Sequence, residues 1–346
     1  MDITELLAFA VKNNSSDLHV STGLPPMIRV DGDLRKVNLP NLDAKTVHSL
    51  LYDIMTDSQQ KMYEQNWETD FSFDVPKLSR FRVNVFQQER GPAGVFRAIP
   101  SKVATVDELN LPPVLQTLSN KKNGLILVTG PTGSGKSTTL AAMIDQLNKT
   151  RYEHILTIED PIEFVHESQK SLVNQREVHQ HTKSFSAALR SALREDPDII
   201  LVGEMRDPET IQLALTAAET GHLVFATLHT NSAAKTINRI IDVFPAGEKE
   251  MVRSMLSESL QAVVSQTLIK RIGGGRVAAC EIMLCTAAIR NLIREDKVAQ
   301  MYSAIQTGHQ MGMQTLDMHL KTLVEQNIIA KAVAKDFALN QTLFDS

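Results

Sequence analysis

Apolar and polar positions alternate with a period of two in the second half of the first hundred residues. The alternating apolar positions are Phe71, Phe73, Val75, Phe81, Val83, Val85 and Val95. This period places successive side chains on opposite faces, so it predicts half-buried antiparallel strands. Arg82 and Arg97 fall on the faces alternate to the apolar ones, where they can point outward. On pattern alone they are either solvated strand charges or functional cations.

Shorter elements are expected before these strands. Helical periodicity covers residues 3–12, and an amphipathic helix is predicted over about residues 44–65. Strands are predicted at residues 17–21, 26–30 and 34–37, with Asp31-Gly32 as the hairpin turn. Residues 1–100 therefore read as an α+β domain.

A proline-rich stretch without periodicity follows. It contains Pro100, Asn110, Pro112 and Pro113. Such residues interrupt regular structure, so residues 101–115 are predicted to be a linker, and residues 116–346 a second domain.

The second domain repeats an apolar strand, a turn and a helix. Strands are predicted at residues 124–129, 154–158, 198–202 and 222–228, and helices at 136–147, 184–194 and 207–219. This order predicts an α/β fold with a mostly parallel sheet and helices on both faces. From Ser232 onward the chain is predicted to be mainly helical, apart from three glycines at 273–275 and a strand at 277–282.

The turn after the first of these strands is a phosphate-binding loop. Its residues are Gly130, Pro131, Thr132, Gly133, Ser134, Gly135, Lys136 and Ser137, a complete GxxxxGK[ST] motif between a strand and a helix. The glycines let backbone N–H groups face phosphate oxygens, and the helix dipole favours the anion. Lys136 supplies charge for the β- and γ-phosphates, and Ser137 an oxygen for Mg²⁺. Thr138, the next residue, completes the candidate ATP-binding set.

Acidic residues follow two other predicted strands. Glu204 comes after residues 198–202, where a carboxylate can orient Mg²⁺ or its water shell. Glu159, Asp160 and Glu163 follow the strand at 154–158. Hydrolysis needs a group that aligns or deprotonates the attacking water, and spacing alone does not rank Glu159 against Glu163.

Two histidines bracket the strand at residues 222–228. His229 lies on its phosphate side and His222 at its beginning. Each is either a phosphate or subunit-boundary contact, or an ordinary structural histidine.

Charge and composition narrow the function classes. The net charge is −4, without the basic excess typical of nucleic-acid binding, so no nucleic-acid partner is expected. The N-terminal residues lack the basic start of a secretory signal, and no run reaches the ~18 apolar residues of a membrane span. A cytoplasmic protein is therefore expected. Cys280 and Cys285 are too few for a four-thiolate zinc site.

These motifs together resemble the secretion and pilus-assembly ATPases. The Walker A loop, the acidic cluster at 159–163, the Walker B strand at 199–204 and the histidine segment at 220–229 match that family in order, and the likeness extends over essentially the whole chain. Within the family the chain is similar to the pilus retraction subgroup, because residues 288–295 (AIRNLIRE) resemble that subgroup's C-terminal signature.

The resemblance implies a fold and site roles. It implies a small PAS-like N-terminal domain, a RecA-like P-loop ATPase domain with a helical C-terminal extension, and a homohexamer that binds ATP between the two domains. It favours Glu163 as the catalytic carboxylate and Glu204 as the Walker B acid, and it places His222 and His229 along the site. Arg82 and Arg97 look like the arginines brought to the phosphates, although Arg80 and Arg90 are neighbouring candidates.

The implied function is a motor that hydrolyses MgATP to retract type IV pili, as in twitching motility. Its implied partners are an inner-membrane platform protein, pilin indirectly and an accessory retraction ATPase, with recruitment to the inner face of the cytoplasmic membrane. The alternatives are the accessory retraction paralogue and a type II secretion ATPase, although the chain lacks the latter's longer N-terminal region and tetracysteine loop. A non-hydrolysing, nucleotide-gated scaffold is the alternative of a different class.

Overall fold

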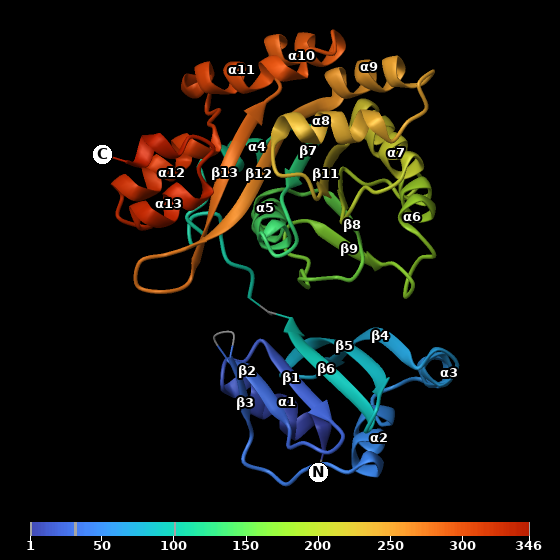
Figure 1. Cartoon of the computed structure of the whole chain (residues 1–346). Coiled ribbons are helices and arrows are strands. Elements are labelled where there is room, and N and C mark those ends of the chain that lie inside the picture. Colours follow the sequence, from blue (N-terminus) through green and yellow to red (C-terminus); the bar gives the residue numbers. More distant parts are fainter. Residues whose placement is uncertain (1, 31–32, 100–101, 346) are drawn as a thin grey trace. The chain divides into compact units, whose positions relative to one another are not determined.

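A computed structural model describes residues 2–30, 33–99 and 102–345 (Figure 1). The chain divides into two compact units, Met1–Lys102 and Val103–Ser346. The predicted turn Asp31-Gly32, together with Pro100 and Ser101 at the start of the predicted linker, lies outside the described residues. Val106 and Leu111, within residues predicted as linker, pack into the core of the second unit.

The first unit is an antiparallel sheet with helices. Its strand order is β3-β2-β1-β6-β5-β4. The strands are β1 (Asp17–Ser21), β2 (Met27–Val30), β3 (Asp33–Lys36), β4 (Glu68–Val75), β5 (Ser79–Gln88) and β6 (Gly91–Ile99), and the helices are α1 (Ile3–Lys12), α2 (Ala44–Tyr52) and α3 (Asp57–Asn66). Val83 and Phe96 face each other in register and are buried in the same core as Leu7 of α1 and Leu51 of α2. The helices therefore cover the apolar side of the sheet.

The single helix predicted at residues 44–65 is wrong, because the chain forms two helices there. Thr56 interrupts it with a capping box, in which its hydroxyl accepts from the Gln59 N–H and the Gln59 side chain accepts from the Thr56 N–H. These two bonds satisfy N–H groups at a new helix start, so the break is encoded locally.

The second unit is a seven-stranded sheet of order β13-β12-β7-β11-β10-β8-β9, parallel throughout except for the β12–β13 pair. The strands are β7 (Gly124–Thr129), β8 (His154–Glu159), β9 (Leu172–Glu177), β10 (Ile199–Val202), β11 (Leu223–Leu228), β12 (Leu260–Lys270) and β13 (Arg276–Leu284). The helices are α4 (Val114–Ser119), α5 (Lys136–Thr150), α6 (Phe185–Ala192), α7 (Pro208–Glu219), α8 (Ala233–Asp242), α9 (Lys249–Ser259), α10 (Ala287–Arg294), α11 (Met301–Thr307), α12 (Leu316–Glu325) and α13 (Lys331–Phe337). The predicted α/β class is confirmed.

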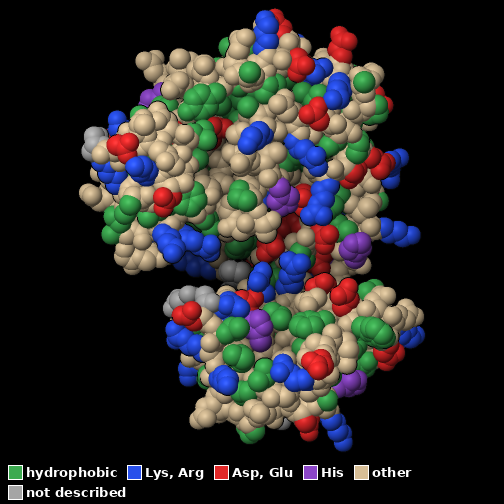
Figure 2. All heavy atoms as spheres, in the orientation of Figure 1, with side chains coloured by type: hydrophobic (Ala, Val, Ile, Leu, Met, Phe, Trp, Pro, Cys, Tyr) green, Lys and Arg blue, Asp and Glu red, His purple; other side chains and the backbone are tan. Residues whose placement is uncertain are grey.

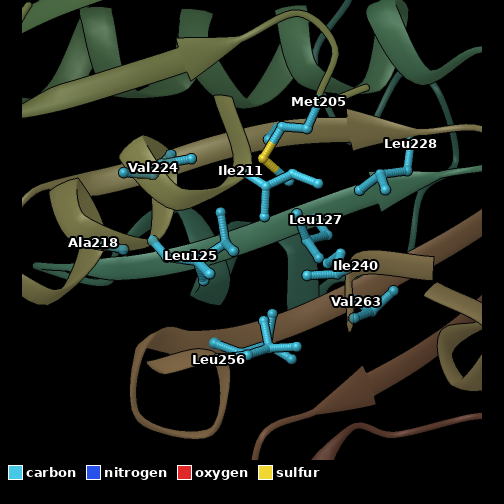
Figure 3. Packing of buried hydrophobic residues seen from close by; sticks show 14 of the residues in the cluster. Leu125, Leu127, Met205, Ile211, Ala218, Val224, Leu228, Ile240, Leu256 and Val263 are labelled. Carbon is cyan, nitrogen blue, oxygen red and sulfur yellow. The ribbon is translucent and has the colours of Figure 1, made fainter. Parts of the chain in front are cut away.

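Both faces of this sheet are buried. On β7, Leu125 and Leu127 point into one apolar cluster (Figure 3), while Ile126 and Val128 point into another. The first cluster is closed by α7, α8 and α9, and the second by α5. Because both faces of β7 are buried, its residues are apolar on both sides and its sequence shows no alternation.

Two strands were not predicted, β9 and β12. The expectation of mainly helical structure after Ser232 is wrong for Leu260–Lys270, which pairs with β7 on one side and β13 on the other. A strand buried on both faces reads as a continuous apolar run, and periodicity alone does not separate such a run from a buried helix.

On the face seen in Figure 2, Lys and Arg side chains lie among Asp and Glu side chains on both units. Within the described residues, no helix is long and apolar enough to span a bilayer.

Candidate active site

The P-loop begins where β7 ends. Gly130, Gly133 and Gly135 have φ angles of 146°, 77° and 88°, which other residues rarely adopt. A Cβ on Gly130 would also lie 2.2 Å from the backbone oxygen of Gln266. The glycines are thus required by geometry, and they place the loop at the N-terminus of α5, where anions bind favourably.

Lys136, the first residue of α5, folds back over this loop. Its Nζ donates to the carbonyl oxygens of Gly130 at 2.9 Å and Pro131 at 3.0 Å. Burial lowers the pKa of its ammonium, while the nearby Glu204 carboxylate acts in the opposite direction. The charge is therefore held at the loop, where phosphates would be received.

Three predicted residues meet in a cavity of about 40 Å³ beside the loop, namely Ser137, Glu159 and Glu163. Their meeting follows from topology, because β7, β8 and β10 are parallel and end at one edge of the sheet.

Glu159 is the last residue of β8, and its side chain accepts hydrogen bonds from neighbouring residues. Its carboxylate accepts from the Thr157 hydroxyl at 2.6 Å, the Gln175 amide at 3.2 Å and the Glu163 N–H at 3.5 Å. Desolvation by burial nevertheless raises its pKa to about 7, against the opposing effect of the hydrogen bonds. Glu159 thus holds the start of the loop that carries Glu163, while its pKa also suits proton transfer near neutrality.

The pKa of Glu159 predicts a pH-dependent stability. Because the folded state binds this proton more tightly than the unfolded state, stability should fall as the pH rises from about 4.5 to about 7. The loss is on the order of 3 kcal/mol when the carboxyl is fully ionised. Urea unfolding across this pH range should show the slope, and Glu159→Gln should flatten it. An unchanged slope in that variant would contradict the assignment.

Glu204, just beyond β10, is contacted by two basic side chains. Its Oε1 accepts from His229 Nε2 at 2.8 Å and from Arg206 Nε at 2.6 Å. The contact raises the pKa of Arg206. His229 follows β11 at the same end of the sheet, and the structure brings it into contact with the predicted Walker B acid.

The structure does not bring His222 to this edge. It precedes β11, and its carbonyl accepts from the N–H of Gly124, the first residue of β7, at 3.0 Å. A strand of six residues separates that end from the P-loop, about 20 Å away. The Nδ1 of His222 instead contacts the Ala217 carbonyl at 2.9 Å. In its own subunit His222 does not line the P-loop, and a role across a subunit boundary stays a prediction.

Arg82 and Arg97 are direct neighbours in the first unit. They pair in register on β5 and β6, and Arg97 also pairs with Asp17, which pairs with Arg29 on β2. Arg97 Nε donates to the buried Asp17 carboxylate at 2.9 Å while its side chain remains 62% exposed. Three guanidinium groups thus share one row of the sheet with one carboxylate, an arrangement suited to anions.

The other two arginine candidates are placed differently. Arg80 lies 3.7 Å from the Asp74 carboxylate, and Arg90 lies in the turn after β5. Neither belongs to the row of Arg82 and Arg97.

The segment AIRNLIRE forms α10, packed on α9. Helical spacing predicts one apolar stripe of Ala288, Ile289, Leu292 and Ile293. Ile289 and Ile293 are fully buried, but Ala288 is exposed. Arg290, which the same spacing places on the opposite side of the helix, donates to the Ser257 carbonyl and to those of Glu258 at 2.7 Å and Leu260 at 3.3 Å. It caps the C-terminus of α9, where an arginine complements the free carbonyls.

Three residues of the site were missed from sequence. Arg206 contacts Glu204, Gln175 contacts Glu159 and the Phe164 carbonyl, and Gln266 contacts the P-loop. Only Arg206 carried a signal, since it stands two positions after the Walker B acid. The glutamines lie on the two strands that were not predicted.

The chain is similar to known proteins over nearly its whole length. The sequence model of the family described as "Type II/IV secretion system protein" matches residues 1–281. The chain is 72% identical to "Type IV pilus retractation ATPase PilT" of Pseudomonas aeruginosa, covering 98% of each, and 63% identical to "Twitching motility protein" of Neisseria gonorrhoeae, covering 91% of this chain and 84% of that one. Among solved structures it matches "Crystal Structure of the Pilus Retraction Motor PilT and Bound ADP" with a TM-score of 0.93 and 48% identity, over 99% of this chain and 98% of that one.

Proposed function

The chain belongs to the type II/IV secretion system protein family, and on that basis we propose that it is an ATPase motor that hydrolyses MgATP to retract type IV pili. The observation that carries the chemistry is the meeting of Lys136, Ser137, Glu163 and Glu204 at one sheet edge. The motor assignment is supported by the 72% identity to a retraction ATPase along the full chain.

The residues at this edge fit a metal–nucleotide complex. P-loop N–H groups and Lys136 would hold the β- and γ-phosphates, and the Ser134 hydroxyl, buried without a partner, sits in that loop. Ser137 and Glu204 offer the hard oxygen ligands that Mg²⁺ prefers, directly or through water. Mg²⁺, when bound, would neutralise charge on the phosphates.

A second cavity adjoins the loop and suits the nucleoside. Its volume is about 380 Å³, and its lining includes Leu109, Gly135, Thr138 and Leu268. Apolar walls next to the phosphate loop would receive a base and ribose.

Hydrolysis then needs water to be aligned and deprotonated. We assign this role to Glu163, with Glu159 holding the loop through its hydrogen bond to the Glu163 N–H. The contact of His229 and Arg206 with Glu204 would keep that carboxylate oriented toward the phosphates.

The two arginines of the first unit should contribute to turnover. Arg82→Ala and Arg97→Ala are each expected to lower kcat/KM at least about tenfold, below the roughly 10³–10⁵ of a single arginine finger because two share the task. Arg35→Ala, an exposed arginine on β3 of the same sheet, is the control. Steady-state ATPase assays would measure the effect. Normal turnover in both variants would show that Arg82 and Arg97 are only solvated charges on their strands.

We further propose that the working form is a homohexamer recruited to the inner face of the cytoplasmic membrane by a platform protein, acting on pilin indirectly and together with an accessory retraction ATPase. The support is the family membership and the similarity to a pilus retraction motor.

Deletion of the gene tests the function. Cells without the protein should accumulate surface pili and lose twitching motility, and the wild-type gene should restore both. Loss of surface pili would instead indicate an extension motor. Unchanged pili and motility, with ATPase activity present in the purified protein, would indicate an accessory or secretion role.

The exposed side of α10 should affect force transmission without affecting chemistry. Ala288→Glu places a charge on an exposed position next to half-buried Leu292, and it is expected to abolish retraction while ATPase activity stays within about twofold, since solvent-exposed substitutions rarely unfold a protein. Ala332→Glu, the same change on the exposed side of α13, is the control. Normal retraction in the Ala288→Glu strain would show that α10 only packs on its own domain.

A further inference from the structure

A buried glutamine on β12 lies against the P-loop. Ser265 pairs with Thr129, the last residue of β7, so Gln266 comes directly beside Gly130, where the loop begins. Gln266 is almost completely buried, at 3% exposure, between Ser265 and Thr267 in β12. A buried amide is unfavourable unless its polar atoms are bonded, so its partners explain its presence.

Both ends of the amide bind the phosphate loop and its helix. Nε2 donates to the carbonyl oxygen of Ser134 at 2.7 Å, and Oε1 accepts from the Thr139 hydroxyl at 2.9 Å. Ser134 lies within the loop, and Thr139 lies one turn into α5, three residues after Lys136. Gln266 therefore bridges the loop and the helix that carries the phosphate-binding lysine.

The bond to Ser134 sets the direction of a phosphate donor. A peptide unit is planar and trans, so its carbonyl and the following N–H point in opposite directions. Fixing the Ser134 carbonyl toward β12 therefore turns the Gly135 N–H away from β12. This N–H belongs to the loop whose backbone donors would wrap the phosphates.

Gln266 also stands between two cavities. It lines the cavity that holds Gly135 and Thr138, and on the other side it lines one of about 410 Å³ together with Pro131. The loop packs closely on the β12 backbone at Gly130, where a Cβ would lie 2.2 Å from the Gln266 carbonyl oxygen. Farther along the loop, Gly135 and Pro131 border these cavities. In the described contacts, the Gln266 amide links β12 to the middle of the loop through its hydrogen bond to the Ser134 carbonyl.

We propose that Gln266 is a positioning residue for phosphate binding, which holds the P-loop in its receptive conformation from the neighbouring strand. The proposal rests on the nucleotide-binding function proposed above. The proposal predicts that loss of Gln266 weakens nucleotide affinity and does not only lower stability. A loop that is ordered before the phosphates bind does not have to be ordered by them.

Gln266→Leu tests the proposal, because it keeps the bulk and removes both hydrogen bonds. The affinity for MgADP, measured by titration calorimetry, is expected to fall about tenfold, because the lost bond to the Ser134 carbonyl is worth on the order of tenfold. Gln314→Leu is the matched control. The Gln314 amide donates to the Cys280 carbonyl at 3.0 Å, and Cys280 is the cross-strand partner of Gln266. The control should lower the thermal unfolding temperature without changing MgADP affinity.

Two further variants keep the test decisive if Gln266→Leu does not fold. Gln266→Glu keeps an acceptor for Thr139 but loses the donor to Ser134 and should bind MgADP weakly. Thr139→Val removes only the helix-side bond and should bind it nearly normally. Wild-type affinity in a folded Gln266 variant, or an equal loss of affinity in Gln314→Leu, would overturn the proposal. A wild-type protein that does not bind MgADP would instead refute the nucleotide function itself.

Discussion

Lys136→Ala is expected to abolish ATP turnover, with a fall in kcat/KM of about a thousandfold or more. The ammonium is held at the loop by the Gly130 and Pro131 carbonyls, and it would supply the positive charge that faces the developing negative charge of the phosphates. Removing one preorganised donor of this kind typically costs about 10²–10³ in rate, and a full charge in a partly buried site costs more. A coupled-enzyme ATPase assay measures the effect.

The fold should survive this change. The two hydrogen bonds described for the Lys136 side chain go to backbone carbonyls of its own loop. The apolar positions of α5 that pack on the sheet are left intact. Lys149→Ala, at the other end of the same helix, removes a half-exposed lysine paired with Asp145 and should leave turnover near wild type. A folded Lys136→Ala protein with the wild-type rate would refute the nucleotide assignment.

Glu163→Gln should preserve MgATP binding and lower kcat about a hundredfold to ten-thousandfold, the usual contribution of general base catalysis. The amide has nearly the shape of the carboxylate but does not accept a proton, so the cavity shared with Ser137 should keep its form. Binding of MgATP and single-turnover hydrolysis should be measured on the same preparation. Glu167→Gln, an exposed glutamate on the same loop, is the control.

The companion variant Glu159→Gln ranks the two carboxylates. If Glu159 only holds the loop, its amide can still accept from Thr157, and turnover should fall modestly. If Glu159 is the base, turnover should collapse, and the wild-type rate should rise with pH around its pKa of about 7. Loss of activity in Glu159→Gln together with activity in Glu163→Gln would reverse our assignment.

Local sequence signals predicted the elements that depend on near neighbours. The P-loop was readable because its glycines are required by φ angles at Gly130, Gly133 and Gly135, a local property. The alternation on β5 predicted which residues face the core, since period two is set by strand geometry. The capping box at Thr56 was equally local, and the single predicted helix overlooked it.

Features that depend on contacts between residues far apart in the chain could not be predicted from the sequence. β12 was missed because both of its faces are buried, with Val263 in one apolar cluster and Ala262 and Val264 in the other, which removes any alternation. The sequence already placed His229 on the phosphate side of its strand, but its contact with Glu204 depends on the pairing of β10 with β11. The pKa of Glu159 depends on its burial and on Gln175, whose strand is separated from it in the chain.

The chain's own order of residues was thus sufficient for the fold class, the phosphate loop, the acids at strand ends and the family resemblance. The first three follow from backbone sterics or strand direction over a few residues, and the resemblance follows from the matched motifs. The tertiary structure alone decided that Glu204 meets Arg206 and His229, that Arg290 caps α9, and that Gln266 braces the loop from 132 residues away. A hydrogen bond between residues far apart in sequence exists only once the sheet has brought their strands together, and no local pattern encodes that meeting.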